Sequence, residues 1–214
     1  MGIDKPLAII GTGGHAKSVS DAATSAGFTV IKFFEYGSSE PSLAREAVGL
    51  EELDFGTVAL SLGIGSNFVR EKVYKALLRD FPDASFPSIV HSAAWVSPRA
   101  LLAPGSVVLA HATVGPSTRI GTGGILNTGS SLDHDGQLGA FASLGPGART
   151  GGYAIIGERT MIGLQAGILQ GRTIGEDTVV GAHSLVDDNI PPMSVAMGIP
   201  CRVTRGRKWA ENYY

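Results

Sequence analysis

Aliphatic residues recur at every sixth position through the C-terminal half of the chain. The series runs from Val96 to Val186, and fifteen of its sixteen members are aliphatic, with Thr150 as the exception. Four residues after each of the first fifteen members stands Ala, Ser, Thr or Gly, and Arg172 is the only departure. An amphipathic helix repeats at about 3.6 residues and a strand at about 2, so neither explains this spacing. The pattern predicts a solenoid of short parallel strands with aliphatic side chains inside and small residues at the corners.

Three hexads make one triangular coil of roughly 18 residues. The series therefore predicts about five coils between residues 93 and 190. Positions next to the inward series are expected to face outward, and several are aliphatic. An exposed apolar surface of that size is unusual for a monomer, so these positions favour a closed homotrimer. The outward aliphatic residues in question are Leu101, Val107, Ile125, Ile155 and Val179.

The first ninety residues follow a different pattern, in which apolar strands alternate with helices. Residues 7–27 predict a strand, a glycine turn and a helix, and residues 28–35 predict a second strand. Residues 57–65 predict a third strand, and residues 67–81 a second helix. This alternation is typical of a small parallel α/β sheet. We therefore expect two domains, an α/β domain over 1–90 and a solenoid with a C-terminal tail over 91–214.

A glycine-rich turn follows the first strand of the α/β domain. Gly11, Gly13 and Ala16 form G-x-G-x-x-A, and Glu35 ends the next strand, which is close to the spacing of a dinucleotide-binding fingerprint. Glycines let the backbone approach a phosphate, and the free N–H groups of a helix start attract an anion. The domain is too small for a full double Rossmann fold, so a half-Rossmann-like nucleotide site is favoured over NAD. A simple tight turn is the alternative.

Composition narrows the function classes. The chain is 43% hydrophobic and 17% charged, and its net charge of −2 argues against a nucleic-acid binder, which would need a clustered basic face. Its apolar runs fall short of the roughly 20 residues that a membrane span needs, and no signal peptide opens it. Cys201 is the single cysteine, so no disulfide forms within the chain. We expect a cytoplasmic protein. No cluster of His, Cys, Asp or Glu has a metal spacing.

Three motifs together resemble one protein family. They are G-x-G-G-H-A-K from Gly11, N-T-x-x-x-x-D-H-D from Asn127, and G-I-P-C-R from Gly198. With the α/β domain and the hexads they resemble the nucleotide-sugar acetyltransferases of the PglD and NeuD type. The resemblance implies a left-handed parallel β-helix and a homotrimer with sites between neighbouring copies. It further implies transfer from acetyl-CoA to the 4-amino group of a GDP- or UDP-linked 4-amino-4,6-dideoxy sugar, as for GDP-perosamine, in polysaccharide or glycan synthesis.

The same resemblance implies roles for individual residues. His134 is the expected general base and Asp135 its acidic partner, although adjacent strand residues face opposite ways, so their contact requires the chain to turn. Ser143 stands where many relatives carry a second histidine, and Gly152 lies one coil beyond His134. The expected nucleotide-sugar residues are Gly11, Gly13, Gly14, His15, Glu35 and Asn127. The expected acetyl-CoA residues are Ser143, Gly152, Leu164 and Arg202.

Two other functions remain open at this point. An O-acetyltransferase of the sialic acid type would use the same fold on a hydroxyl group. A β-helix that only binds nucleotide-sugars would also suit the hexads, but it would leave the D-H-D segment without a reason. For His134 itself, the alternative to catalysis is a solvated turn residue.

Overall fold

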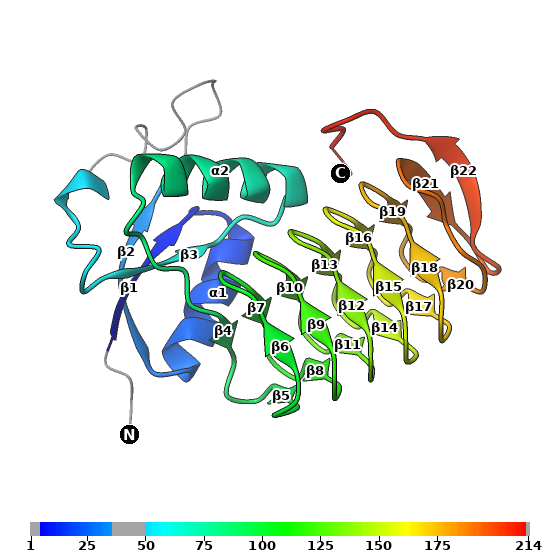
Figure 1. Cartoon of the computed structure of the whole chain (residues 1–214), viewed down its shortest axis with the longest axis horizontal. Helices are drawn as coiled ribbons and strands as arrows, with labels where there is room; N and C mark the ends of the chain where they lie inside the picture. Colours follow the sequence, from blue (N-terminus) through cyan, green and yellow to red (C-terminus); the bar gives the residue numbers. More distant parts are fainter. Residues whose placement is uncertain (1–4, 36–49, 213–214) are drawn as a thin grey trace.

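The computed structural model describes residues 5–35 and 50–212 and places a small α/β domain against one end of a long solenoid (Figure 1). In the α/β domain three parallel strands form a sheet of order β2-β1-β3. The predicted order of strands and helices is confirmed. Its elements are β1 (Lys5–Ile10), α1 (Gly14–Ser25), β2 (Phe28–Phe34), the 3-10 turn η1 (Leu50–Glu52), β3 (Ala59–Leu62) and α2 (Asn67–Asp80).

The solenoid is a parallel β-helix, as the hexad pattern predicted, and it is left-handed, as the family resemblance implied. It has about six turns, one more than the hexads predicted. Most of its strands are two residues long, and strands one coil apart pair in parallel to build three faces. The first face holds β4 (Ile89–Val90), β7 (Val107–Val108), β10 (Ile125–Leu126), β13 (Ser143–Leu144), β16 (Met161–Ile162), β19 (Val179–Val180), β21 (Ser194–Met197) and the antiparallel β22 (Arg202–Gly206). The second face holds β5 (Trp95–Val96), β8 (Thr113–Val114), β11 (Ser131–Leu132), β14 (Arg149–Thr150), β17 (Gly167–Ile168) and β20 (Leu185–Val186). The third face holds β6 (Leu101–Leu102), β9 (Arg119–Ile120), β12 (Gln137–Leu138), β15 (Ile155–Ile156) and β18 (Thr173–Ile174).

The interior of the solenoid is the predicted aliphatic series. Every member from Val108 to Val186 is buried, and the aliphatic members form one continuous apolar core together with small corner residues. Val96 and Leu102 are only partly buried because they lie in the first coil, which has no coil beneath it. Burial of apolar side chains on three faces at once explains why such short strands are stable.

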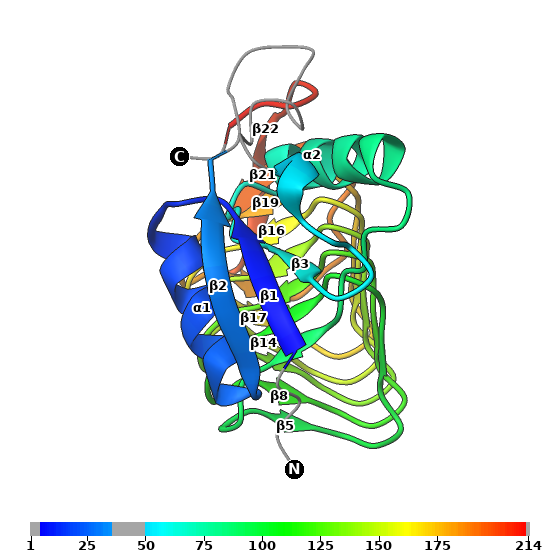
Figure 2. The same ribbon diagram turned by 90° about the vertical axis from the view of Figure 1, so that its left-hand side faces the viewer.

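The α/β domain covers the N-terminal part of the first face (Figure 2). Side chains of β1 and α1 share a core with Ile89, Val107 and Ile125 of the solenoid. Val107 and Ile125 were expected to be exposed, and that expectation is wrong, because the α/β domain packs on them. The outward residues of the third face behave as expected, since Leu101 and Ile155 are 56% and 41% exposed.

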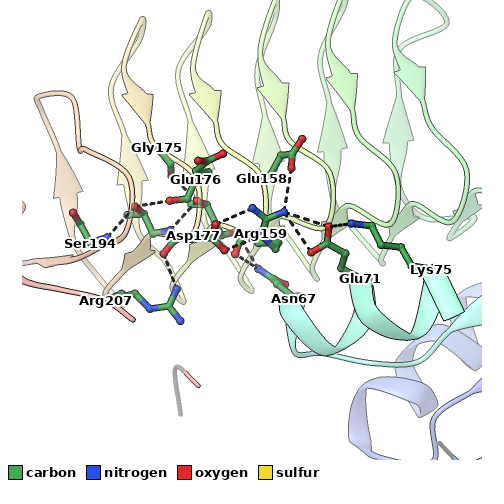
Figure 3. A network of polar contacts seen from close by, with 12 residues as sticks. Asn67, Glu71, Lys75, Glu158, Arg159, Gly175, Glu176, Asp177, Ser194 and Arg207 are labelled. Carbon is green, nitrogen blue, oxygen red and sulfur yellow. Dashed lines mark hydrogen bonds and ion pairs between the residues drawn. The ribbon is translucent and has the colours of Figure 1, made fainter. Parts of the chain in front are cut away.

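The C-terminal tail folds back toward the start of α2. Arg159 of the solenoid forms a two-bonded ion pair with Asp177 at 2.8 Å and also contacts Glu71 of α2 (Figure 3). The ring of Trp209 in the tail lies against Arg159 and meets Phe68 edge-on. These contacts join both domains to the tail. No helix of the described segments has the length and apolar character that crossing a membrane takes.

Candidate active site

His134 and Asp135 lie at an exposed corner between β11 and β12. The chain turns sharply there, because Asp135 has a φ of 56°, in the left-handed region. This turn brings the two neighbouring side chains together, with Nδ1 of His134 2.9 Å from Oδ2 of Asp135. The contact that the sequence made conditional on a turning corner is therefore present. The side chain of His134 remains 46% exposed, so a substrate can reach it.

The surroundings of His134 favour its protonated form. The hydrogen bond to Asp135 is the main cause that raises the imidazole pKa above 6.5, and the charges of Asp133 and Asp135 add to it. A proton on Nδ1 that is held by Asp135 leaves the lone pair of Nε2 available. The pair is therefore arranged to accept a proton at Nε2 and to stabilise the resulting imidazolium.

Gly152 lies one coil beyond His134, and the imidazole ring occupies the space beside it. A Cβ atom added at Gly152 would overlap Cε1 and Nε2 of His134. The missing side chain of Gly152 therefore leaves room for the imidazole ring itself. The N–H of Gly152 has no hydrogen-bond partner among the described residues.

Two neighbours of His134 were not singled out from the sequence. Tyr153 is exposed, and its ring meets the imidazole edge-on with centroids 5.3 Å apart. Its N–H also donates to the His134 carbonyl at 2.9 Å. Thr150, the one polar member of the inward series, accepts a hydrogen bond from the N–H of Asp133 at 3.1 Å. The break in the aliphatic series was the only signal for Thr150, and no pattern marked Tyr153.

Five of the residues expected to bind the nucleotide-sugar line one cleft of about 460 Å³. The cleft lies where β1 ends and α1 begins, with the segment from Gly63 to Ser66 as its other wall. Gly11 adopts a φ of 118°, and a Cβ there would come within 2.7 Å of the Gly63 carbonyl, so a larger residue does not fit. The five residues are Gly11, Gly13, Gly14, His15 and Glu35.

His15 is the most buried ionisable group of this cleft. Burial, with the nearby charge of Arg70, lowers its pKa from 6.5 to about 4, so its imidazole is neutral at pH 7. Its Nε2 is buried and has no hydrogen-bond partner within the described residues. A buried polar atom without a partner is costly, and a ligand in the cleft can supply one.

The other predicted residues are spread over the solenoid. Asn127 lies at the corner after β10, outside the cleft, and its Oδ1 accepts a hydrogen bond from the Thr128 N–H at 3.1 Å. Leu164 is exposed at the corner between the first and second faces, a different corner from that of His134 and Gly152. Arg202 pairs with Asp187 at 2.7 Å, just after β20, toward the C-terminal end of the His134 corner.

Ser143 does not fit the contact with acetyl-CoA that was expected of it. It is only 3% exposed, because α2 covers it. Its hydroxyl donates to Oδ1 of Asn67 at 2.7 Å and accepts from Arg70 at 3.1 Å. Both partners belong to α2, so Ser143 lies in the junction between the domains and not on a surface open to a cofactor. Within the described segments no group of three His, Cys, Asp or Glu side chains is arranged to hold a metal ion.

The comparisons with known proteins agree with this architecture. The family model of the PglD N-terminal domain matches residues 6–77. The acetyltransferase domain of PglB from Neisseria gonorrhoeae, solved with acetyl coenzyme A, is 30% identical, with a TM-score of 0.83 over 94% of this chain and 99% of that one. PerB from Caulobacter crescentus, solved with CoA and GDP-perosamine, is 34% identical, with a TM-score of 0.84 over 94% of this chain and 97% of that one.

Curated relatives match over a shorter stretch. Galactoside O-acetyltransferase of Escherichia coli is 44% identical over 58 residues, which is 27% of this chain and 29% of that protein. The chain thus spans between a quarter and a third of the length of curated relatives of this kind. The two near-complete structural matches define the class: a left-handed β-helix acyltransferase that carries an N-terminal α/β domain. Within that class, this chain belongs to the PglD-type family of nucleotide-sugar acetyltransferases.

Proposed function

We propose that the protein transfers the acetyl group of acetyl-CoA to the 4-amino group of a GDP- or UDP-linked 4-amino-4,6-dideoxy sugar. One observation carries this proposal: an exposed His134 is held by Asp135 beside a glycine with a free N–H. It is supported by the 34% identical PerB, whose structure contains both CoA and GDP-perosamine. The product would serve the synthesis of a surface polysaccharide or glycan.

The chemistry assigns each group a step. The sugar amine attacks the thioester carbonyl carbon, and the carbonyl oxygen becomes an oxyanion that the Gly152 N–H stabilises. Nε2 of His134 takes the proton from the attacking nitrogen, while Asp135 stabilises the imidazolium. The C–S bond then breaks, and the CoA thiolate leaves and receives the proton. Holding both substrates in place contributes up to roughly 7–11 kcal/mol, so positioning is as important as proton transfer.

The cleft in the α/β domain is the proposed nucleotide site. The free N–H groups at the start of α1 suit the diphosphate, and the unpartnered Nε2 of His15 suits a hydroxyl donor of the sugar or ribose. Acetyl-CoA is assigned to the solenoid corner that carries Gly152, with Arg202 at its end. We also propose a homotrimer, because Leu101 and Ile155 leave an apolar groove open on the third face, next to the His134 corner.

The test is a measurement of CoA thiol release with matched acceptors. GDP-perosamine and a UDP-linked 4-amino sugar are each compared with the analogue in which a hydroxyl group replaces the 4-amino group. We expect release with at least one amino acceptor and a kcat at least 10²-fold lower in His134→Asn. Thiol release only with hydroxyl acceptors would establish the O-acetyltransferase instead. No release with any acceptor, together with tight binding of a nucleotide-sugar, would indicate a binding protein.

A further inference from the structure

The hydrogen-bond ladder of the solenoid departs from its regular pattern beside His134. For every other inward residue from Val96 to Ile168, the following N–H donates to the carbonyl of the inward residue one coil ahead, as Asn127 does to Leu144 and Gly139 to Ile156. At Asp133 the N–H donates to the side-chain Oγ1 of Thr150 instead, at 3.1 Å. Strands β11 and β14 accordingly pair only through Ser131 and Arg149, whereas neighbouring pairs use two residues each.

Two further hydrogen bonds connect the corner at Asp133 to the imidazole ring. Oδ1 of Asp133 accepts a hydrogen bond from the backbone N–H of His134 at 2.7 Å. The carboxylate of Asp135 then holds Nδ1 of the ring. Thr150 itself is followed by Gly151 and Gly152, so its backbone also sets the position of the glycine beside the ring.

We propose that Thr150 is a positioning residue for His134: its buried hydroxyl replaces a ladder carbonyl, shifts the corner at Asp133, and so sets the imidazole over Gly152. This inference rests on the proposed function, since it assigns Thr150 a part in the same reaction. Thr150 contacts neither substrate and acts only through the backbone of its neighbours.

A purely structural role does not explain a hydroxyl at this position. The other fifteen members of the inward series are aliphatic, and valine has nearly the shape of threonine. A hydroxyl in an apolar interior is unfavourable unless it is hydrogen-bonded, so valine would pack at least as well. The hydroxyl instead accepts the Asp133 N–H, which moves this hydrogen bond away from the regular ladder. The affected corner is the one that carries His134.

Three variants test the proposal. Thr150→Val keeps the shape and removes the hydroxyl, and Thr150→Ser keeps the hydroxyl. Thr178→Val is the matched control, because Thr178 is also buried and its hydroxyl also accepts a backbone N–H, that of Ser194, at a corner without a proposed catalytic group. We expect kcat to fall about tenfold or more in Thr150→Val, with both KM values within twofold of the parent. Thr150→Ser should retain most of the activity, and Thr178→Val should retain kcat.

A second measurement does not depend on activity. The imidazole of His134 is titrated by NMR in each variant, with Asp133, Asp135 and Tyr153 as the groups that face it. We expect the imidazole pKa to fall in Thr150→Val, because a relaxed corner loosens the hydrogen bond to Asp135, and to stay unchanged in Thr178→Val. If no acceptor is acetylated, the proposed function fails, and the titration still decides whether Thr150 sets the ring. An unchanged titration and an unchanged kcat in Thr150→Val would overturn the inference.

Discussion

The hydroxyl of Ser143 is joined to the amide oxygen of Asn67 by a hydrogen bond of 2.7 Å, across the junction between the solenoid and the α/β domain. Arg70 donates hydrogen bonds to both side chains and is only 1% exposed. Its guanidinium donates to the carbonyls of Ile64 and Gly65, which line the nucleotide cleft. It also donates to solenoid acceptors, so one side chain ties the cleft wall to the solenoid. The solenoid acceptors are the carbonyls of Gly123 and Phe141 and the hydroxyl of Ser143.

Replacement of Ser143 separates a junction role from cofactor binding. We expect Ser143→Ala to lower the free energy of unfolding by about 1–3 kcal/mol, because two buried partners on α2 each lose a hydrogen bond. The KM for acetyl-CoA should change less than twofold. Thr113→Ala, which removes an exposed hydroxyl from the second face, is the control and should leave stability nearly unchanged. A selective rise in the acetyl-CoA KM without loss of stability would restore the cofactor role.

Gly152 should tolerate no side chain without loss of activity. In Gly152→Ala the new Cβ would overlap the His134 ring, which can move by rotating away. We therefore expect a loss of kcat of about 10²-fold with little change in thermal stability or in either KM. Gly167→Ala is a suitable control one coil further on, because its Cβ would meet Leu185 at an ordinary 3.6 Å. Equal activity of the two variants would show that the imidazole position is not critical.

The pH dependence of kcat/KM should follow the His134–Asp135 hydrogen bond. A general base works only when it is unprotonated, and Asp135 raises the imidazole pKa. Activity should therefore rise with pH through an apparent pKa above 6.5, and Asp135→Asn should move this acidic limb to lower pH while lowering the maximal rate. Asp83→Asn, a change of the same kind in the exposed loop after α2, should leave the profile in place. If the acidic limb of the profile keeps its position in Asp135→Asn, the titrating group is not His134.

The sequence predicted the solenoid well because each coil repeats the same local rule. An inward aliphatic residue every six positions requires no knowledge of distant contacts, so the burial from Val108 to Val186 followed directly. The same rule failed for the outward residues Val107 and Ile125, because their burial depends on where a separate domain docks. No repeat carries that information.

In the candidate active site, too, local features were predicted and distant contacts were not. His134 and Asp135 were found because their motif is local, and the sharp turn at Asp135 that brings them together follows from the corner of the coil. The junction contacts of Ser143 were not foreseen, because its partners, Asn67 and Arg70, are more than seventy residues away in sequence. Contacts of that separation are set by tertiary packing, which a single sequence does not display.

The mass of the protein in solution tests the proposed trimer directly. Three copies of the 22.1 kDa chain give about 66 kDa, which we expect from sedimentation equilibrium at micromolar concentration. A double change of Leu101 and Ile155 to Glu places charges in the apolar groove of the third face and should yield monomers that have lost acetyl transfer but still bind nucleotide in the cleft. Ile31→Glu, at an exposed site of β2, should remain trimeric. A parent protein of about 22 kDa would contradict the assembly.

His15 should make the stability of the fold sensitive to mild acid. Its pKa is about 4 in the folded protein and near 6.5 when unfolded, so between these values the unfolded chain binds more protons. The contribution of His15 to the free energy of unfolding should therefore be constant above about pH 6.5 and should fall as the pH drops toward 4. The full loss would be roughly 2–4 kcal/mol, since each pKa unit corresponds to about 1.4 kcal/mol.

Urea unfolding at several pH values between 4.5 and 7.5 measures this dependence. His15→Asn cannot take up a proton, so its free energy of unfolding should fall less steeply over this range than that of the parent. His183→Asn, at an exposed corner of the solenoid, should keep the parent slope. Parallel curves for the parent and His15→Asn would mean that His15 is not held neutral in the cleft, and the unpartnered Nε2 would then be no argument for a hydroxyl donor of the nucleotide-sugar at that position.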